Sequence, residues 1–434
     1  MKKILFIIPF IPYPLDSGGN QAFYNMIEFI RRNMDVSIIL YPRRSHDKRN
    51  VKQLKKLWNN VTFYVFDGNY QAEEEEKHSR YYSILLKAQK SIARKIKRCQ
   101  FNVTGSMKDE NIDIVRAHST LPNSIYQPLD ESYLNYVIDI ANKGFDIIQV
   151  EFFELIALGY VLPKNVDTIF VHHELRYIHN ENELDVFQDK KNIDMLNYRV
   201  ATDFERAALL QYKHIIALTE VDKLLLSKLL NKEENIYASP AIVQIEQESK
   251  KPFKATCNHT LTFVGSENHN PNLDAATWFC KEIAPLLRKK NFKFTFKLIG
   301  SWHGKYMTYL QKICPELQLT GFVENLNDAI AGSIAIVPIR IGSGMRMKIL
   351  DAIQSDTPFV TTSKGCEGLD FCNGQECLIA DTPQDFADAL IHLADNASLQ
   401  ETMVKNARAK LNTIYQPQEM LNKRMNIYNR ILKQ

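Results

Sequence analysis

Short apolar runs alternate with longer amphipathic segments along most of the chain. The runs KKILFIIPF, DVSIILY and VTFYVF are rich in β-branched and aromatic residues, which predicts buried strands. Between the first two, the segment NQAFYNMIEFIRRN repeats its apolar residues at helical spacing and predicts a helix with one face on the sheet. Continuous apolar strands separated by helices are typical of parallel sheets that are covered on both faces. We therefore predict an α/β fold.

The alternation stops between Asn231 and His259, where polar and charged residues prevail and two prolines occur. A second series of strands and helices follows, from LTFVGS to ECLIAD, and further amphipathic helices close the chain. The pattern predicts two doubly wound, Rossmann-like domains at residues 1–240 and 260–415, joined by a linker at residues 241–259. In such sheets ligands bind at the carboxyl ends of the strands, so we expect the site in a cleft between the domains.

Composition narrows the class of protein. The chain has 434 residues, of which 45% are hydrophobic and 24% charged, as in soluble globular proteins. The seven cysteines include no C-x-x-C pair, which favours reduced thiols in a cytoplasmic protein over a zinc site or a disulfide framework. Prolines interrupt the apolar amino-terminal run and no A-x-A-like cleavage site follows it, so a first strand explains it better than a signal peptide. No apolar run approaches the roughly 20 residues that span a bilayer, so we expect at most peripheral membrane contact.

One strand-to-helix transition, IAIVPIRIGSGMRMKILDAI, combines glycines with charged residues. Gly342 and Gly344 would let backbone N–H groups approach an anion at the start of the helix, and Arg346 and Lys348 add positive charge there. A diphosphate suits this arrangement. Other phosphate-binding motifs do not fit, since no G-x-x-x-x-G-K-[ST] occurs and G-x-G-x-x-G would need glycine at Met347. Alone, the turn is explained better by a purely structural role.

The longer string PIRIGSGMRMKILDAIQSDTPFVTTSKGCEGL, after FVGSENHNPNLDAATWF and LTGFVENLNDAIA, resembles the donor-binding domain of family four retaining GT-B glycosyltransferases, particularly bacterial surface-polysaccharide enzymes. The resemblance covers residues 260–415, and PYPLDSGGNQ and FERAALLQYKHIIALTEVDK match more loosely. It implies a GT-B architecture with an acceptor-binding first domain and a carboxyl-terminal helix, residues 416–434, that crosses back to it. It also implies metal-independent, cofactor-free transfer of a hexose from a nucleotide diphosphate sugar to a glycan or lipid-linked acceptor.

Position by position, the resemblance assigns donor binding to a few residues. Asp351 falls on the helix acid that takes the ribose hydroxyls in the family, where glutamate is usual, and Ser343 falls on a second family acid, eight residues earlier. Arg346 and Lys348 resemble the diphosphate clamp, which has to stabilise the leaving group because the family uses no metal there. The remaining residues of the expected donor site are Gly342, Gly344, Met345, Gly321, Phe322, Val323 and Ser266.

In the first domain, Gly18 and Gly19 lie past the first strand, where a close-packed backbone can touch the phosphates or the acceptor; a plain turn explains them equally well. Glu151 ends the strand FDIIQVEF, where many relatives carry a histidine that faces the acceptor. His172 and His173 end the next strand. Because neighbouring side chains of a strand point to opposite faces, only one of them should point inward, and we expect His173 to face the acceptor.

The resemblance implies a retaining mechanism, in which the acceptor hydroxyl approaches the sugar on the face that the diphosphate leaves and a diphosphate oxygen takes the proton. No strong protein base is then required. Two rival classes stay open. A sugar-nucleotide 2-epimerase would need several acids around the sugar, where this chain has Ser343. A non-catalytic partner subunit with the same fold is compatible with Asp351 and Ser343, which both depart from the family pattern.

Positive charge is concentrated in one stretch of the chain. The net charge is +4, but residues Arg31 to Cys99 contain 17 Lys and Arg against 7 Asp and Glu, so this stretch carries +10 and the remainder −6. Within it, YYSILLKAQKSIARKIKRCQF sets basic among apolar residues, as in amphipathic helices that lie on anionic lipid. A solvated helix face is an equally good interpretation. Nucleic acid is disfavoured because the aromatic residues are not interleaved with the basic ones.

Surface-polysaccharide transferases, which this chain resembles, normally extend a sugar carried on a membrane lipid. We therefore predict peripheral binding to anionic membranes, to which each Lys or Arg contributes about 1 kcal/mol. Co-sedimentation should detect binding to anionic but not to neutral vesicles, and salt should abolish it by roughly 0.5 M because the attraction is screened. Replacement of Arg94, Lys95, Lys97 and Arg98 by Gln should have the same effect. Indifference to both vesicle types would make the stretch a solvated surface.

Overall fold

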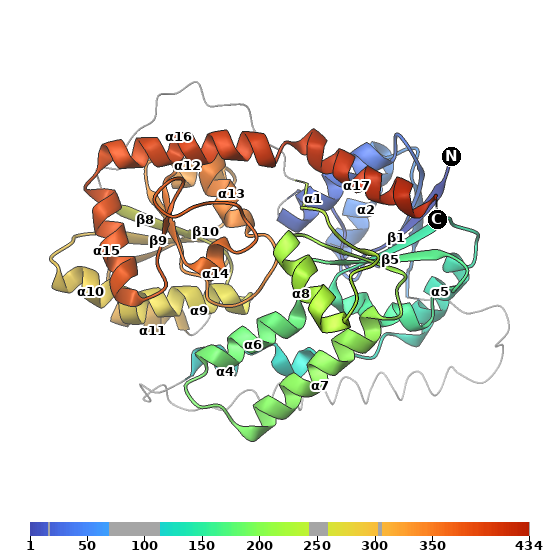
Figure 1. Cartoon of the computed structure of the whole chain (residues 1–434), viewed down its shortest axis with the longest axis horizontal. Helices are drawn as coiled ribbons and strands as arrows, with labels where there is room; N and C mark the ends of the chain where they lie inside the picture. Colours follow the sequence, from blue (N-terminus) through green and yellow to red (C-terminus); the bar gives the residue numbers. More distant parts are fainter. Residues whose placement is uncertain (16–17, 69–112, 243–258, 303–305, 434) are drawn as a thin grey trace.

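The computed structural model describes residues 1–15, 18–68, 113–242, 259–302 and 306–433. Two parallel sheets, each with helices packed on it, form two lobes that lie side by side (Figure 1). The two doubly wound domains that the hydrophobic pattern predicts are thereby confirmed. The basic stretch at residues 81–101 lies outside the described residues, as does most of the expected linker at residues 241–259.

The described part of the first lobe has a seven-stranded sheet in the order β3-β2-β1-β4-β5-β6-β7. The order reverses between β1 and β4, which is the switch point where doubly wound sheets bind ligands. The four apolar residues of β1 from Ile4 to Ile7 are fully buried, because helices cover both faces of the sheet. The strands are β1 (Lys3–Ile7), β2 (Asp35–Leu40), β3 (Thr62–Val65), β4 (Ile147–Glu151), β5 (Asp167–His172), β6 (His214–Ala217) and β7 (Ile236–Ala238).

Helix α6 of the first lobe is anchored at its first turn by a buried carboxylate. Glu205 of α7 accepts hydrogen bonds from the backbone amides of Arg176 (2.9 Å) and Tyr177 (2.6 Å), which have no partner within the helix. The described helices of this lobe are α1 (Gly18–Ile30), α2 (Ser45–Leu57), α4 (Ile114–Ala117), η1 (Leu121–Asn123), α5 (Glu131–Ala141), η2 (Phe153–Tyr160), α6 (Arg176–Val186), α7 (Asn192–Leu209) and α8 (Glu220–Leu230).

The second lobe has a six-stranded sheet, in the order β10-β9-β8-β11-β12-β13, within the described residues. Its strands are β8 (Thr260–Val264), β9 (Thr295–Ile299), β10 (Leu317–Gly321), β11 (Ile334–Val337), β12 (Phe359–Thr361) and β13 (Leu378–Ile379). Its helical segments are α9 (Asn270–Trp278), η3 (Phe279–Ile283), α10 (Ala284–Lys289), α11 (Tyr306–Ile313), α12 (Leu326–Ile330), α13 (Met347–Gln354), α14 (Ser363–Cys366), α15 (Pro383–Ala394) and α16 (Ala397–Ile414). The turn from β11 to α13 contains the glycines that the sequence analysis singles out.

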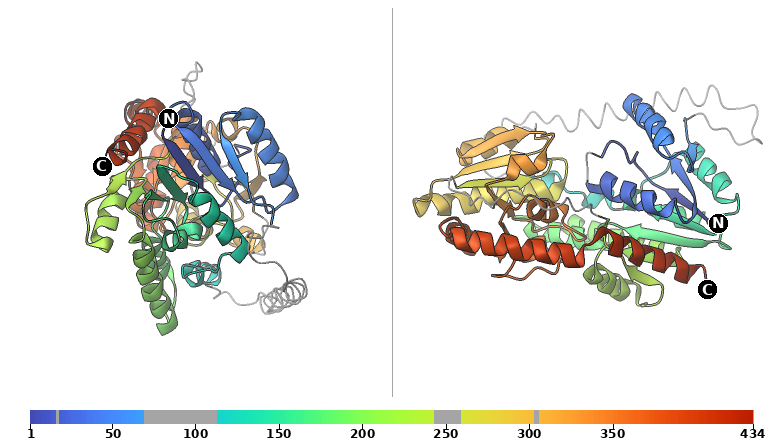
Figure 2. Two further views of the ribbon diagram at one scale, coloured as in Figure 1. Left: turned by 90° about the vertical axis from the view of Figure 1, so that its right-hand side faces the viewer. Right: turned by 90° about the horizontal axis from the view of Figure 1, so that it is seen from above.

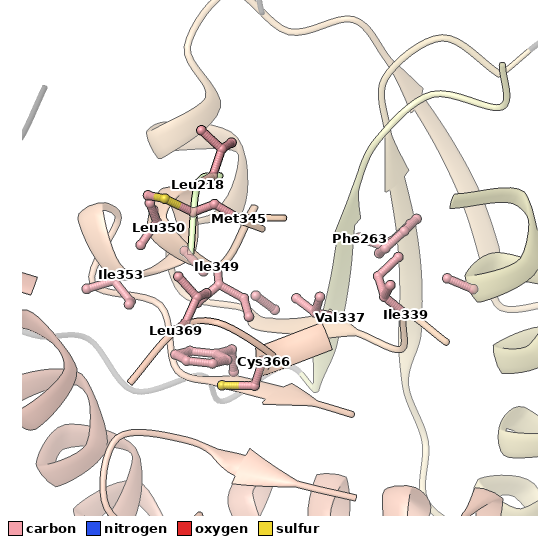
Figure 3. Close-up of a cluster of buried hydrophobic side chains, with 14 of the residues drawn as sticks. Leu218, Phe263, Val337, Ile339, Met345, Ile349, Leu350, Ile353, Cys366 and Leu369 are labelled. Carbon is pink, nitrogen blue, oxygen red and sulfur yellow. The ribbon is translucent and has the colours of Figure 1, made fainter. Parts of the chain in front are cut away.

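Buried apolar side chains from both lobes pack around this turn. Figure 3 shows Val337 of β11 and Ile349 of α13 in one cluster, with Leu218 of the first lobe beside Met345 of the turn. All four side chains are buried. The apolar core is therefore continuous from one lobe to the other, and the start of α13 packs in it.

The last helix, α17 (Pro417–Ile431), packs on the first lobe, although α16 lies along the second (Figure 2). Arg424 donates to Ser239 Oγ over 2.9 Å, and the Tyr428 hydroxyl donates to Gln149 Oε1 over 2.6 Å. Arg424 and Tyr428 are themselves buried, so α17 is an integral part of the first lobe. Among the helices of the described residues, none is long and apolar enough to cross a membrane.

Candidate functional site

The glycine turn between β11 and α13 lies directly against the first lobe. Gly342 and Gly344 have φ angles of 106° and 78°, a backbone conformation that favours glycine. A Cβ atom at Gly344 would collide with the carbonyl oxygen of His173, and one at Gly342 would lie 2.5 Å from the carboxylate of Glu174. Both glycines are therefore required for the close approach of the turn to the loop after β5.

Side chains of the first lobe already bind the backbone amides of this turn. Gly342 N–H donates to Asn182 Oδ1 over 3.2 Å, and Gly344 N–H donates to Asp222 Oδ2 over 3.1 Å. The sequence analysis expects these amides to face an anion. In this structure a diphosphate would have to displace Asn182 and Asp222 in order to use them. Ser343, also predicted, is buried between the lobes, where its hydroxyl accepts a hydrogen bond from the Leu175 amide over 2.6 Å.

Arg346 is a partly buried cation with unused hydrogen-bond donors. Its Nη1 donates to the backbone oxygen of Ser343. Its Nε and Nη2 are buried and have no hydrogen-bond partner within the described part of the chain. Burial lowers the pKa of the guanidinium, and the charges of Glu174 and Asp222 oppose this shift. Unpaired buried donors on a cation are unusual and point to an anionic ligand.

Lys348, the second residue of α13, lies close to the first turn of α9. Its Nζ is 2.5 Å from Asn272 Oδ1 and 4.6 Å from the centre of the Phe263 ring. Burial, and then the charge of Arg346, lower the pKa of Lys348 to about 7. Asn272 also donates from its Nδ2 to the backbone oxygen of Ser266 over 3.0 Å, so the predicted residue Ser266 borders this site through its main chain.

Asp351 follows Lys348 on the same helix. Burial raises the pKa of its carboxyl group to about 6, although the charge of Lys348 acts in the opposite direction. No hydrogen bond to this carboxylate is found within residues that the structure describes. A perturbed acid without a protein partner, next to perturbed bases, is typical of a binding site.

Arg340, by contrast, is paired with a buried carboxylate. Its Nε and Nη2 donate to the two carboxylate oxygens of Asp274 over 3.1 and 2.6 Å, and its guanidinium lies 4.9 Å from the centre of the Trp278 ring. Burial raises the pKa of Asp274, and Arg340 opposes that shift. The first arginine of the turn therefore ties the loop to α9 and has a structural role.

On the first lobe, the structure brings Glu151 and His173 together. His173 Nε2 lies 2.9 Å from Glu151 Oε2, and its ring stacks on Phe152 with a centroid distance of 3.9 Å. His172 points the other way and is buried against Glu205, with 2.6 Å between Nε2 and Oε1. The two histidines thus lie on opposite faces, and His173 is the one next to the glycine turn.

A series of hydrogen bonds that links the two lobes could not be predicted from the sequence. His179 of α6 bridges Glu174 (2.8 Å) and Glu183 (3.0 Å), and Asn270 of α9 donates to Glu183 over 2.6 Å. The two carboxylates outweigh the effect of burial and raise the pKa of His179 to about 9. Nothing in the local sequence indicates this contact, because Glu183 and Asn270 belong to different lobes.

The other predicted residues lie at the end of β10, in the loop after it, and at the start of α1. Gly321 ends β10 with a φ angle of 77°, and Phe322 after it is 71% exposed, with Val323 partly buried beside it. Gly18 and Gly19 form the start of α1 and are not in a turn directly after β1. A Cβ atom on Gly19 would lie 3.9 Å from the Phe152 ring.

Residues 258–396, which contain all of these second-lobe elements, match the family model described as glycosyl transferases group 1. The chain carries a group 1 glycosyltransferase domain. It is accordingly a glycosyltransferase, as the resemblance predicts. A protein of Klebsiella pneumoniae described as an uncharacterized 44.6 kDa protein in the cps region is 22% identical over 422 residues, which cover 94% of this chain and 95% of that protein.

Solved structures share the fold of this glycosyltransferase. A TarM variant of S. aureus, in complex with fondaparinux, α-GlcNAc-glycerol and UDP, superimposes with a TM-score of 0.66 at 13% identity, over 99% of this chain and 100% of that one. HepE of Anabaena, in complex with UDP and glucose, gives a TM-score of 0.62 at 12% identity, again over 99% and 100% of the two chains. The predicted GT-B architecture is therefore confirmed.

We expect Asp351→Asn to stabilise the ligand-free glycosyltransferase at pH 7. The carboxyl pKa is 3.8 in the unfolded chain and about 6 in the folded one, so stability is lost as the pH rises through this window. Asparagine removes that loss, which amounts to at most about 3 kcal/mol at pH 7 and vanishes near pH 4. Thermal unfolding at both pH values measures the difference.

The matched control is Glu401→Gln on the exposed surface of α16, which should change stability little at either pH. A gain for Asp351→Asn that is equal at pH 4 and pH 7, or no gain at pH 7, would contradict the assignment of a partly buried, unpartnered carboxylate.

Proposed function

We propose that this enzyme transfers a sugar, with retention of configuration, from a nucleotide diphosphate sugar to a hydroxyl of a glycan or lipid-linked acceptor. We further propose that the reaction belongs to the synthesis of a cell-surface polysaccharide. The relative from a cps region of Klebsiella pneumoniae supports this role, as do the sugars and UDP in the complexes of TarM and HepE.

The observation that carries the proposal is the partly buried charge, without a full set of hydrogen-bond partners in the described part of the chain, at the start of α13. Arg346 has two unused donors, and the Asp351 carboxylate has no hydrogen bond among the described residues. Lys348 lies between them in the sequence and has a pKa of about 7. A diphosphate would take up the cations, and a ribose would donate its hydroxyls to Asp351. One ligand with both groups, a nucleotide diphosphate, satisfies all three residues.

The geometry supports a role for these cations in the chemical step. Negative charge develops on the diphosphate as the bond to the sugar breaks, and fixed buried cations stabilise such charge more than water does. An anionic ligand also raises the pKa of Lys348, so this side chain is charged when it is needed. A diphosphate oxygen takes the proton of the acceptor hydroxyl, which approaches from the side of His173 and Glu151. We propose that this step needs no metal.

We expect Asp351→Ala to weaken nucleotide diphosphate binding by about 1.5–3 kcal/mol, the range for a hydrogen bond to a charged group. Asp351→Glu keeps the carboxylate and should bind as well as the native enzyme or better. Isothermal titration calorimetry on both variants gives the comparison. Unchanged affinity in a folded Asp351→Ala variant would remove this residue from the ribose site.

Arg346→Ala and Lys348→Ala should each lower kcat by more than they raise KM for the donor, because the charge that they stabilise is greatest in the transition state. Lys312→Ala, on the exposed face of α11, is the control and should leave both constants unchanged. Steady-state kinetics with EDTA present should give native rates. An increase in KM alone would make the two residues anchors, and a strict requirement for magnesium would contradict the proposed clamp.

A further inference from the structure

A buried chain of hydrogen bonds joins the last helix to His173. The Tyr428 hydroxyl of α17 lies 2.6 Å from Gln149 Oε1, and Gln149 Nε2 lies 2.6 Å from Glu151 Oε1. The other oxygen of Glu151 lies 2.9 Å from His173 Nε2. Tyr428 and Gln149 have no solvent-exposed surface, so water does not compete for these bonds.

The direction of each hydrogen bond in this chain is determined. An ionised carboxylate only accepts, so Gln149 has to turn its amide N–H₂ toward Glu151 and its oxygen toward Tyr428. The Tyr428 hydroxyl must then donate. Burial, and then the charge of Glu151, raise the pKa of Tyr428 to about 12 despite the charge of Arg424, so the phenol keeps its proton at neutral pH.

The chain constrains the imidazole of His173 in two ways. Glu151 binds Nε2, and the ring is stacked on Phe152 at an interplanar angle of 8°. A neutral imidazole therefore carries its proton on Nε2 and keeps a lone pair on Nδ1, for which no partner is found among the residues described. The His173 side chain is 22% exposed, whereas Tyr428, Gln149 and Glu151 are buried. Its Nδ1 is therefore available to a ligand.

Helix α17 also contributes a positively charged residue, Arg424, near Glu151 and His173. Arg424 is buried, and its hydrogen bonds within the described residues go to Ser239 and to the sulfur of Met26, none of which is charged. Arg424, Glu151 and His173 all line one cavity of about 20 Å³. Arg424 thus places a positive charge beside the same cavity as the carboxylate that contacts His173.

We propose that Tyr428 is a positioning residue for sugar transfer, which acts through Gln149 and Glu151 to hold His173 in one tautomer and one orientation toward the acceptor hydroxyl. This inference rests on the proposed function, which puts His173 on the acceptor side of the cleft. According to this inference, helix α17 contributes to the position of His173 in the first lobe, in addition to connecting the two lobes.

The test uses Tyr428→Phe in the full chain, which removes the hydroxyl and keeps the ring. The matched control is Tyr415→Phe, which removes another buried hydroxyl from the same end of the chain but lies outside the hydrogen-bonded chain. Loss of one buried hydrogen bond should lower kcat of Tyr428→Phe by about threefold to tenfold. The donor KM should not change, and Tyr415→Phe should retain the native kcat.

Nitrogen-15 NMR of histidine-labelled enzyme gives a readout that a loss of stability alone would not change. The His173 signals, identified by their absence in His173→Gln, should report the Nε2–H tautomer in the native enzyme and in Tyr415→Phe. They should report a mixture of tautomers in Tyr428→Phe. Should Tyr428→Phe not fold, Gln149→Met breaks the same chain at its next member and should give the same kinetic and NMR result.

His173→Ala separates failure of this inference from failure of the proposed function. If His173→Ala loses transfer while Tyr428→Phe and Gln149→Met keep native rates and a single tautomer, the positioning role is overturned and the site assignment stands. If His173→Ala transfers sugar at the native rate, the acceptor-side assignment of His173 is overturned, and with it the role of Tyr428 in transfer.

Discussion

The two lobes of this glycosyltransferase meet where a glycine turn lies against a loop that leaves no room for a side chain. The missing Cβ atoms of Gly342 and Gly344 let the turn approach the residues after β5. As a result, Ser343 reaches the Leu175 amide and His173 comes next to the turn that leads to Arg346. The relative position of the two lobes therefore follows from a steric constraint, and the hydrogen bonds across the interface are possible only because that constraint is met.

The residues around this contact use charge in two different ways. Arg340 and Asp274 satisfy each other, as buried ions in a structural role do. Arg346 and Asp351 keep charge without a full set of hydrogen-bond partners in a partly buried place, which lowers the stability of the free protein. The same short segment thus contains both a structural ion pair and charges that the described residues leave unpaired.

How much the sequence reveals differs from feature to feature. The two sheets could be predicted because strands such as β1 are buried on both faces and leave an apolar run, and the different orientations of His172 and His173 follow from strand geometry. Asn182, Asp222 and Asn270 could not be found, since their partners are 87 to 160 positions away and no local pattern marks them. The residue types alone do not distinguish Arg340 from Arg346, since both are arginines beside the same turn. The family resemblance assigns the clamp to Arg346, and the position of Asp274 gives Arg340 its structural role.

The position of α17 also has a consequence for biosynthesis. Tyr428 and Gln149 are 279 positions apart, and Arg424 and Met26 are 398 apart, yet both pairs lie inside the first lobe. Domains generally fold from the amino terminus while the chain is still being made. Here the first lobe stays open along one side, with Gln149 and Met26 uncovered, until α17 has been synthesised. A chain truncated before α17 would therefore hold an incomplete first lobe.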